Sequence, residues 1–300
     1  MRAIRNTLMF TAVVLIQLSA LSCGSGDEGT EWPFHVVADS PYLGERPPGD
    51  DPVVFAPGTV SLPGSVEMGI TFSADGREIY FARSAGTTAR SSWSIWTCRE
   101  EEGGWTDPHK ADFSRHRDFS PHMSADGRRF YFFSQNPEDP DFLEGTYVAE
   151  RIGDRWGEAV FFHKGYGIVA ALSGNLYSSS DHHMGSDLVV FREVGDGFSE
   201  PQDLPEGINT EGVNAHVAMA PDESYFLFDS NRDSDPPRSR IHVTFRREDG
   251  SWSEPVMLGE KINAVHSIIP AISPDGDYIF FHREGDIWWV SSAAIDRLRP

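Results

Sequence analysis

The sequence predicts an all-β fold, and three observations support this. Nearly the same turn is written four times, in the stretches FSADGREIYFAR, MSADGRRFYFFS, MAPDESYFLFDS and ISPDGDYIFF. Aromatic residues make up 12% of the 300 residues, and glycines and prolines are scattered throughout, which favours many short strands over long helices. The Asp-Gly pair suits a tight hairpin turn, because glycine accepts a positive φ and aspartate bonds the backbone.

Residues 1–22 have the layout of an export signal. Arg2 and Arg5 precede an apolar run over residues 8–18, and small residues then lead to Cys23. The segment SALSC resembles a bacterial lipobox, which implies that the Cys23 thiol is acylated and becomes the new N-terminus. We therefore expect an exported protein, lipid-anchored to the cell envelope at the outer membrane or its periplasmic face. An ordinary secretory signal with an incidental cysteine is the alternative.

Residues 23–51 mix glycine, proline and acidic residues without periodicity, and they are predicted to be a tether followed by an entry segment. The folded domain is expected to span residues 52–300. Cys98 is the only other cysteine, so a lipidated Cys23 leaves no intramolecular disulfide. Cys98 lies in a strand-like alternation and is expected to be a small buried hydrophobic residue.

Internal repeats decide the architecture. Asp75, Asp126, Asp222 and Asp275 hold the same place in the four turns, and the interval between Asp126 and Asp222 leaves room for one more copy. The stretch IVAALSGNLYSSS, at 168–180, is that copy in degenerate form. The chain therefore has five repeats of about fifty residues, at the upper end of the lengths that propeller blades use.

A second motif recurs half a repeat later, in EEGGWTDPHKA, GDRWGEAVFF, GDGFSEPQDL and DGSWSEPVML. Each copy is a glycine-containing turn followed by Trp or Phe. Two turns per repeat predict a small antiparallel sheet of two hairpins, with the aromatic residue packed between neighbouring sheets. The recurring Asp, Gly and Trp residues are therefore interpreted as structural.

Sheets of this kind arranged around an axis form a β-propeller, which deals with exposed strand edges by radial closure. The last repeat lacks its own outer strand, and DPVVFAPGTVS, residues 51–61, is similar to the missing piece. We predict a five-bladed β-propeller whose last blade is closed by an N-terminal strand at 53–60. A six-bladed ring is the alternative.

The turns SADG, SADG, APDE and SPDG, with aromatic strands behind them, resemble the WD40-like repeats of TolB-type periplasmic propellers. The resemblance covers residues 41–300, and residues 230–281 look like a nearly complete copy of the repeat. It implies the fold and a place among bacterial propeller lipoproteins. TolB itself has an extra domain and six blades, so its role in envelope assembly does not transfer to this chain.

The candidate binding site is the axial mouth where the loops enter the innermost strands. Counting back eight residues from each turn aspartate reaches a polar residue, and three histidines fall on or just before the same strands. Three imidazoles and two carboxylates there could bind a cation, a sugar or a basic peptide. The alternative is that all are solvated loop residues. The predicted site residues are Glu67, Asp118, His122, Asn214, His216 and His266.

Charge and missing motifs limit the function. The formal charge of −21 argues against nucleic acid as a partner. No phosphate loop, nucleophile elbow or zinc-protease motif occurs, so no catalytic residue, cofactor or metal is predicted. The cluster SSSDHHMGSD is interpreted as an exposed loop, because adjacent histidines on a strand point to opposite faces.

We therefore expect a non-catalytic cell-envelope binding or scaffold propeller that recognises an envelope protein, a peptide or a glycan. It is expected to be a monomer that meets the membrane only through its lipid. The alternative is a carbohydrate-active enzyme, a polysaccharide lyase or glycosidase, that uses carboxylates and histidines of the central funnel.

Overall fold

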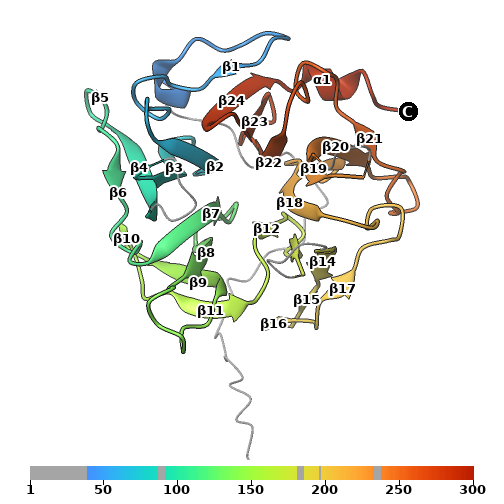
Figure 1. Cartoon of the computed structure of the whole chain (residues 1–300), viewed down its shortest axis with the longest axis horizontal. Coiled ribbons are helices and arrows are strands. Elements are labelled where there is room, and N and C mark those ends of the chain that lie inside the picture. Colours follow the sequence, from blue (N-terminus) through green and yellow to red (C-terminus); the bar gives the residue numbers. More distant parts are fainter. Residues whose placement is uncertain (1–38, 87–91, 181–185, 196, 233–237) are drawn as a thin grey trace, which may run out of the picture.

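The computed structural model describes residues 39–86, 92–180, 186–195, 197–232 and 238–300. These residues form five antiparallel sheets of four or five strands, the blades, around a common axis, and one separate two-stranded hairpin (Figure 1). In each blade the first strand of the repeat lies nearest the axis and the later strands lie progressively outward. The predicted five-bladed β-propeller is confirmed, with five blades in the described part of the chain.

Blades 1 and 2 have the longest strands. Blade 1 consists of β2 (Val66–Phe72), β3 (Glu78–Ser84), β4 (Trp93–Glu101), β5 (Gly104–Trp105) and β6 (His109–Lys110). Blade 2 consists of β7 (Arg117–Met123), β8 (Arg129–Gln135), β9 (Gly145–Ile152), β10 (Arg155–Trp156) and β11 (Val160–His163).

Blade 3, built from the degenerate repeat, has shorter strands. It consists of β12 (Val169–Ala170), β13 (Leu176–Ser179), β14 (Leu188–Phe191) and β17 (Gln202–Asp203), with a small hairpin of β15 (Glu193–Val194) and β16 (Gly197–Phe198) beside it. Blade 4 consists of β18 (Asn214–Met219), β19 (Tyr225–Ser230), β20 (Arg240–Phe245) and β21 (Val256–Met257).

Blade 5 joins the two ends of the described chain. It consists of β22 (Ser267–Ile272), β23 (Tyr278–Arg283), β24 (Asp286–Ser291) and β1 (Val53–Val54). A 3-10 turn, η1 (Tyr42–Gly44), precedes β1, and a short helix, α1 (Ala293–Asp296), follows β24. Among the described residues no helix is long and apolar enough to cross a membrane.

The N-terminal strand closes the ring as predicted. Val53 and Val54 pair antiparallel with β24, and buried Phe55 packs at 5.2 Å from the ring of Trp289. The paired segment is shorter than the predicted 53–60. Ala56 has a positive φ of 43° that turns the chain, and Pro57 has no N–H to donate to a ladder.

The recurring turn residues have the structural role expected of them. Asp75 Oδ1 accepts hydrogen bonds from the Ser73 hydroxyl at 2.6 Å and from the Arg77 N–H at 3.1 Å. Asp126 and Asp275 accept the equivalent pairs of bonds. These carboxylates hold their own turns together.

Aromatic side chains fill the spaces between blades. The ring of Trp156 in blade 2 lies 5.2 Å from that of Phe130 in its own blade, and its indole N–H donates to the Tyr80 hydroxyl of blade 1 at 3.1 Å. This is the inter-sheet position predicted for the aromatic residue after the second turn. Cys98 is fully buried in the cluster that includes Ile79 and Phe81, and burial raises the pKa of its thiol to about 12.

Candidate functional site

All five repeats share one unusual backbone feature near the axis. In the four repeats with a turn aspartate, the residue two positions after the predicted polar position has a positive φ, and Gly167 has one at the equivalent place in the remaining repeat; the five angles lie between 48° and 66°. In four innermost strands the pairing register shifts at this point, as it does at a β-bulge. We call these residues the bulge ring: Gly69, Ser120, Gly167, His216 and Ile269.

The bulge ring is tightly packed and partly strained. A Cβ added to Gly69 would lie 3.3 Å from Pro121 Cδ, and one added to Gly167 would lie 3.2 Å from His216 Cα. A positive φ is uncommon outside glycine, and for a β-branched residue such as Ile269 it is exceptional. Strain of this kind persists only where the surrounding packing enforces it, and it gathers at functional sites.

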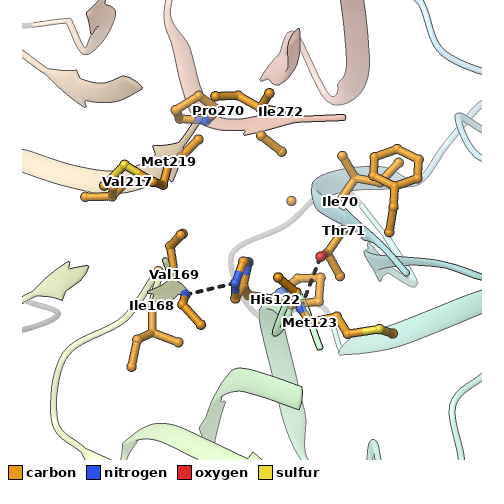
Figure 2. A pocket seen from close by; sticks show the side chains of 18 of the residues that line it. Ile70, Thr71, His122, Met123, Ile168, Val169, Val217, Met219, Pro270 and Ile272 are labelled. Atoms are coloured by element: carbon orange, nitrogen blue, oxygen red, sulfur yellow. Dashed lines mark hydrogen bonds between the residues drawn. The ribbon is translucent and has the colours of Figure 1, made fainter. Parts of the chain in front are cut away.

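An axial pocket lies on one side of the bulge ring. Its volume is about 150 Å³, and its walls run from the bulge ring to the Ala or Pro that precedes the turn aspartate, such as Ala74 and Pro274. Figure 2 shows Ile70, Ile168, Val217 and Pro270 around this space. The pocket therefore occupies the part of the channel nearest the Asp-Gly turns.

The lining of the axial pocket is mainly aliphatic. Each of the five innermost strands contributes, and among the described lining residues none is an Asp or a Glu. His122 and His216 supply the ionisable side chains of the wall. A small cavity with such walls suits an apolar group, because aliphatic surfaces offer dispersion contacts and few hydrogen bonds.

His122 lines the axial pocket as a neutral imidazole. Its Nε2 accepts a hydrogen bond from the Ala170 N–H of blade 3 at 2.9 Å, so the ring proton resides on Nδ1 (Figure 2). Burial among protein atoms lowers the pKa of His122 to about 4. Thr71 holds the same position in blade 1 and links blades 1 and 2 in the same way: its hydroxyl accepts a hydrogen bond from the Met123 N–H at 3.1 Å.

His216 is oriented by a buried carboxylate. Its Nδ1 donates to Asp229 Oδ1 at 2.7 Å, and the same oxygen accepts the Ile269 N–H of blade 5 at 2.9 Å. The Tyr166 ring lies 4.8 Å from the imidazole. Asp229 thus fixes both the orientation of His216 and the junction between two blades.

The structure places the predicted polar residues away from the axial pocket. Glu67, Asp118 and Asn214 are at most 1% exposed, and each bonds to the loop that enters its own strand. Asp118 Oδ2 accepts from the Ser114 hydroxyl at 2.9 Å and from the His116 N–H at 3.1 Å, while Asn214 Nδ2 donates to the Thr210 carbonyl at 2.8 Å. Counting back from the turn aspartates thus identified equivalent positions in the repeats, but the side chains at these positions hold loops in place and do not line the pocket.

Glu67 is fully buried and paired with an arginine. Its Oε1 accepts from Arg83 Nε at 2.9 Å and from the Ser65 hydroxyl, and Arg83 also donates to the carbonyls of Thr59 and Val60. Burial raises the pKa of Glu67 against the opposing effects of Ser65 and Arg83. The pair therefore fastens the segment behind β1 to blade 1.

His266 is exposed, just before β22. Burial lowers the pKa of neighbouring His282, and the charges of His266 and His216 act in the same direction. His282 Nδ1 donates to the Glu67 carbonyl at 2.8 Å. Of the six predicted site residues, the structure brings only His122 and His216 into the axial pocket.

The histidine cluster SSSDHHMGSD largely falls outside the described residues, which omit 181–185. Asp187 is described, and its Oδ1 accepts a 3.4 Å bond from Asn214 Nδ2. No group of three or more metal-ligating side chains occurs in the described ranges.

The apolar wall was not predicted, although a signal for it exists. The three positions after the bulge-ring residue read Ile-Thr-Phe, Pro-His-Met, Ile-Val-Ala, Val-Ala-Met and Pro-Ala-Ile in the five repeats. Aligning the repeats would have shown that His122 stands at a position where three other blades have Val or Ala.

Comparisons with known proteins support the fold. No protein-family model matches the sequence, and no curated protein matches it. The structure of a putative TolB from Agrobacterium tumefaciens aligns with a TM-score of 0.50 at 16% identity, over 78% of this chain and 79% of that one. At this identity the likeness shows the propeller fold alone.

Other solved propellers are more distant in shape. A periplasmic gluconolactonase from Pseudomonas aeruginosa aligns with a TM-score of 0.44 at 12% identity, over 71% of this chain and 64% of its own. An α-L-arabinofuranosidase from Podospora anserina aligns with a TM-score of 0.49 at 12% identity, over 81% of this chain and 96% of its own. The similar structures thus include enzymes as well as TolB proteins, and this chain is a five-bladed propeller with a TolB-like fold.

Proposed function

We propose that this protein is a non-catalytic binding or scaffold propeller of the bacterial cell envelope, anchored by a lipid on Cys23. In this proposal the axial pocket takes an apolar side chain of a protein or peptide partner. The observation that supports it is the pocket wall, which is aliphatic on all five blades and has no carboxylate among its described residues. A cation or a basic peptide would need such a carboxylate, and a glycan would need more hydrogen-bonding groups.

The pocket size favours a side chain as the inserted group. A dry apolar cavity of about 150 Å³ holds a group of the size of benzene. His122 and His216 lie on the wall and could orient the partner's polar backbone through hydrogen bonds. The envelope location rests on the lipobox resemblance and is part of the proposal.

The carbohydrate-active alternative has no supporting geometry in the axial pocket. Hydrolysis of a glycosidic bond generally uses two carboxyl groups that flank the bond. Glu67 and Asp118, the expected pair, are both buried in loop-anchoring hydrogen bonds.

Binding of display-selected peptides tests the proposal. Peptides selected on the folded domain should carry a required aliphatic or aromatic residue, and calorimetry should show weaker binding to Ala271→Leu, which places a larger side chain in the pocket wall. Val194→Leu, on an exposed hairpin, is the matched control and should bind like the parent. Equal binding to the parent and Ala271→Leu would reject the axial pocket as the site.

A further inference from the structure

A second hollow lies between blades 1 and 2, away from the axial pocket. Its volume is about 650 Å³, within the range of pockets that take small organic ligands. We call it the inter-blade groove; its walls come from β3, β4 and β6 on one side and from β8, β9 and β10 on the other, with the 111–118 segment between them. Figure 1 shows these two blades side by side.

Half-buried aromatic rings line the inter-blade groove. Phe142 and Tyr147 stack at 5.5 Å with an interplanar angle of 19°, and His116 lies 4.8 Å from Phe142. Phe113 and Trp156, also half-buried, contribute to the same lining. Partly exposed rings gathered in one concave surface offer flat apolar faces on which a ligand can stack.

A buried carboxylate lies in the wall of the same groove. Asp118 is 1% exposed, and its Oδ2 holds the 114–116 segment. Its Oδ1 and the neighbouring Ser134 hydroxyl have no hydrogen bond of normal geometry, but Ser134 interacts with this carboxyl and opposes the rise of its pKa that burial causes. Asp118 and Tyr147 both line the groove, and the pKa of Tyr147 is raised by burial and, to a smaller extent, by the charge of Asp118. A buried carboxylate oxygen without a hydrogen bond of normal geometry thus lies in the groove wall beside the aromatic rings.

Charged side chains of both signs surround these groups. Arg115 and Arg155 are exposed donors, and Asp154 and Glu158 are exposed acceptors. A purely cationic ligand would be repelled by the arginines, and a purely anionic ligand by the carboxylates. A ligand with many neutral hydroxyl groups can use donors and acceptors together.

We propose that the inter-blade groove binds an oligosaccharide, with a sugar ring stacked on the Phe142–Tyr147 wall and a sugar hydroxyl donating to Asp118. Carbohydrates combine apolar C–H faces with hydroxyls that both donate and accept, and the groove offers a partner for each of these features. The inference concerns a site separate from the axial pocket and does not depend on the peptide-binding function.

Isothermal titration of the whole folded domain with defined oligosaccharides tests this proposal. The probes are cellotetraose, chitotetraose, maltotetraose and trigalacturonate, which together cover neutral, N-acetylated and acidic sugars. At least one should bind saturably, and Phe142→Ala should weaken that binding about tenfold or more. Asp118→Asn, which keeps the shape of the side chain, should weaken it as well.

Two controls keep the outcomes separate. Phe198→Ala removes a half-buried aromatic ring from blade 3, and Ala271→Leu alters the axial pocket; both should leave sugar affinity unchanged. Melting curves show whether each variant is folded. Because Phe142 lies in a connecting segment, its variant stays informative if Asp118→Asn fails to fold.

Three results would overturn the proposal. The first is no saturable binding of any of the four sugars. The second is binding that Phe142→Ala and folded Asp118→Asn leave unchanged. The third is tighter, variant-sensitive binding of tryptamine, an aromatic amine, which would assign the groove to a cationic ligand instead. Loss of peptide binding in Ala271→Leu with sugar binding intact would separate the two sites.

Discussion

The axial pocket and the inter-blade groove are built in opposite ways. The pocket takes equivalent residues from all five blades, and its shape follows from the bulge that every repeat carries near the axis. The groove is built by two blades and the segment between them. The axial pocket therefore depends on a backbone feature that all five repeats share, whereas the groove depends on side chains that occur in two of them.

The same contrast exists inside the axial pocket. The bulge ring recurs five times, but only one of its members is an imidazole, His216, and only one blade has a histidine at the position of His122. The turn aspartates Asp75, Asp126 and Asp275, in contrast, make the same pair of contacts in three blades. The following predictions concern both kinds of feature: those that several blades share and those that occur in one blade or at the periphery.

The largest effect is expected from deleting residues 41–61, which complete the fifth sheet. The deletion removes the buried side chains of Tyr42, Phe55 and Val60 and exposes the edge of β24. Losing burial of this size should lower the melting temperature by about 10 °C or more and broaden the transition. Differential scanning calorimetry measures both. A truncated domain that melts as hot and as sharply as the parent would contradict closure by β1.

The next effect comes from the loop-anchoring carboxylate in blade 1. Glu67→Ala leaves the Arg83 guanidinium buried without its carboxylate, and breaking such a pair costs about 3–5 kcal/mol. Asp39→Ala is the control, because its contact with Arg77 is 4.0 Å long and largely exposed, and such pairs contribute about 0–1 kcal/mol. Urea denaturation should separate the two variants clearly; similar midpoints would mean that Glu67 is dispensable.

The repeats made most of the fold predictable. The spacing of the turns predicted the number of blades. The absence of an outer strand in the last repeat predicted that an N-terminal strand completes the last blade and so closes the ring. The length of the closing strand was overestimated, because the positive φ of Ala56 could not be foreseen from a run of apolar residues. Hydrophobic patterns in the sequence indicate which residues belong to one strand. They do not show where an uncommon backbone angle ends that strand.

The candidate site was predictable only in part. Counting back from the turns located equivalent positions, but the bulge ring shifts the alternation of side chains in the innermost strands, so residues on its two sides face different surroundings. This explains why Glu67 and Asp118 anchor loops while His122 lines the pocket. The inter-blade groove left no periodic signal, because it joins a loop of one repeat to strands of two.

The neutral imidazole of His122 predicts a pH dependence of stability. Its folded-state pKa of about 4 is below the ordinary value of 6.5, so the unfolded chain binds a proton more readily between these values. Stability should therefore fall as the pH drops from about 6.5 to about 4, by on the order of 1–3 kcal/mol, and level off below that range.

His122→Gln isolates this contribution. Glutamine can keep an acceptor for the Ala170 N–H but does not titrate, so the variant should lose stability less steeply between pH 6.5 and 4. The raised pKa values of Glu67 and Asp118 act in the opposite direction and remain in both proteins, so the difference between the two curves reports His122. Parallel curves would show that His122 does not titrate as inferred.

The smallest effect expected is the difference between two glycine substitutions. Gly69 in the bulge ring and Gly153 in an outer turn have nearly the same φ, 59° and 61°, so alanine meets similar backbone strain at both positions. Only at Gly69 would the new Cβ be crowded, at 3.3 Å from Pro121, whereas no atom lies within 4 Å of the position at Gly153. Gly69→Ala should therefore be less stable than Gly153→Ala by about 1 kcal/mol, measured by thermal or urea unfolding. Equal losses would mean that the bulge ring has room to adjust, and that its backbone angles, rather than its close packing, are what the five repeats preserve.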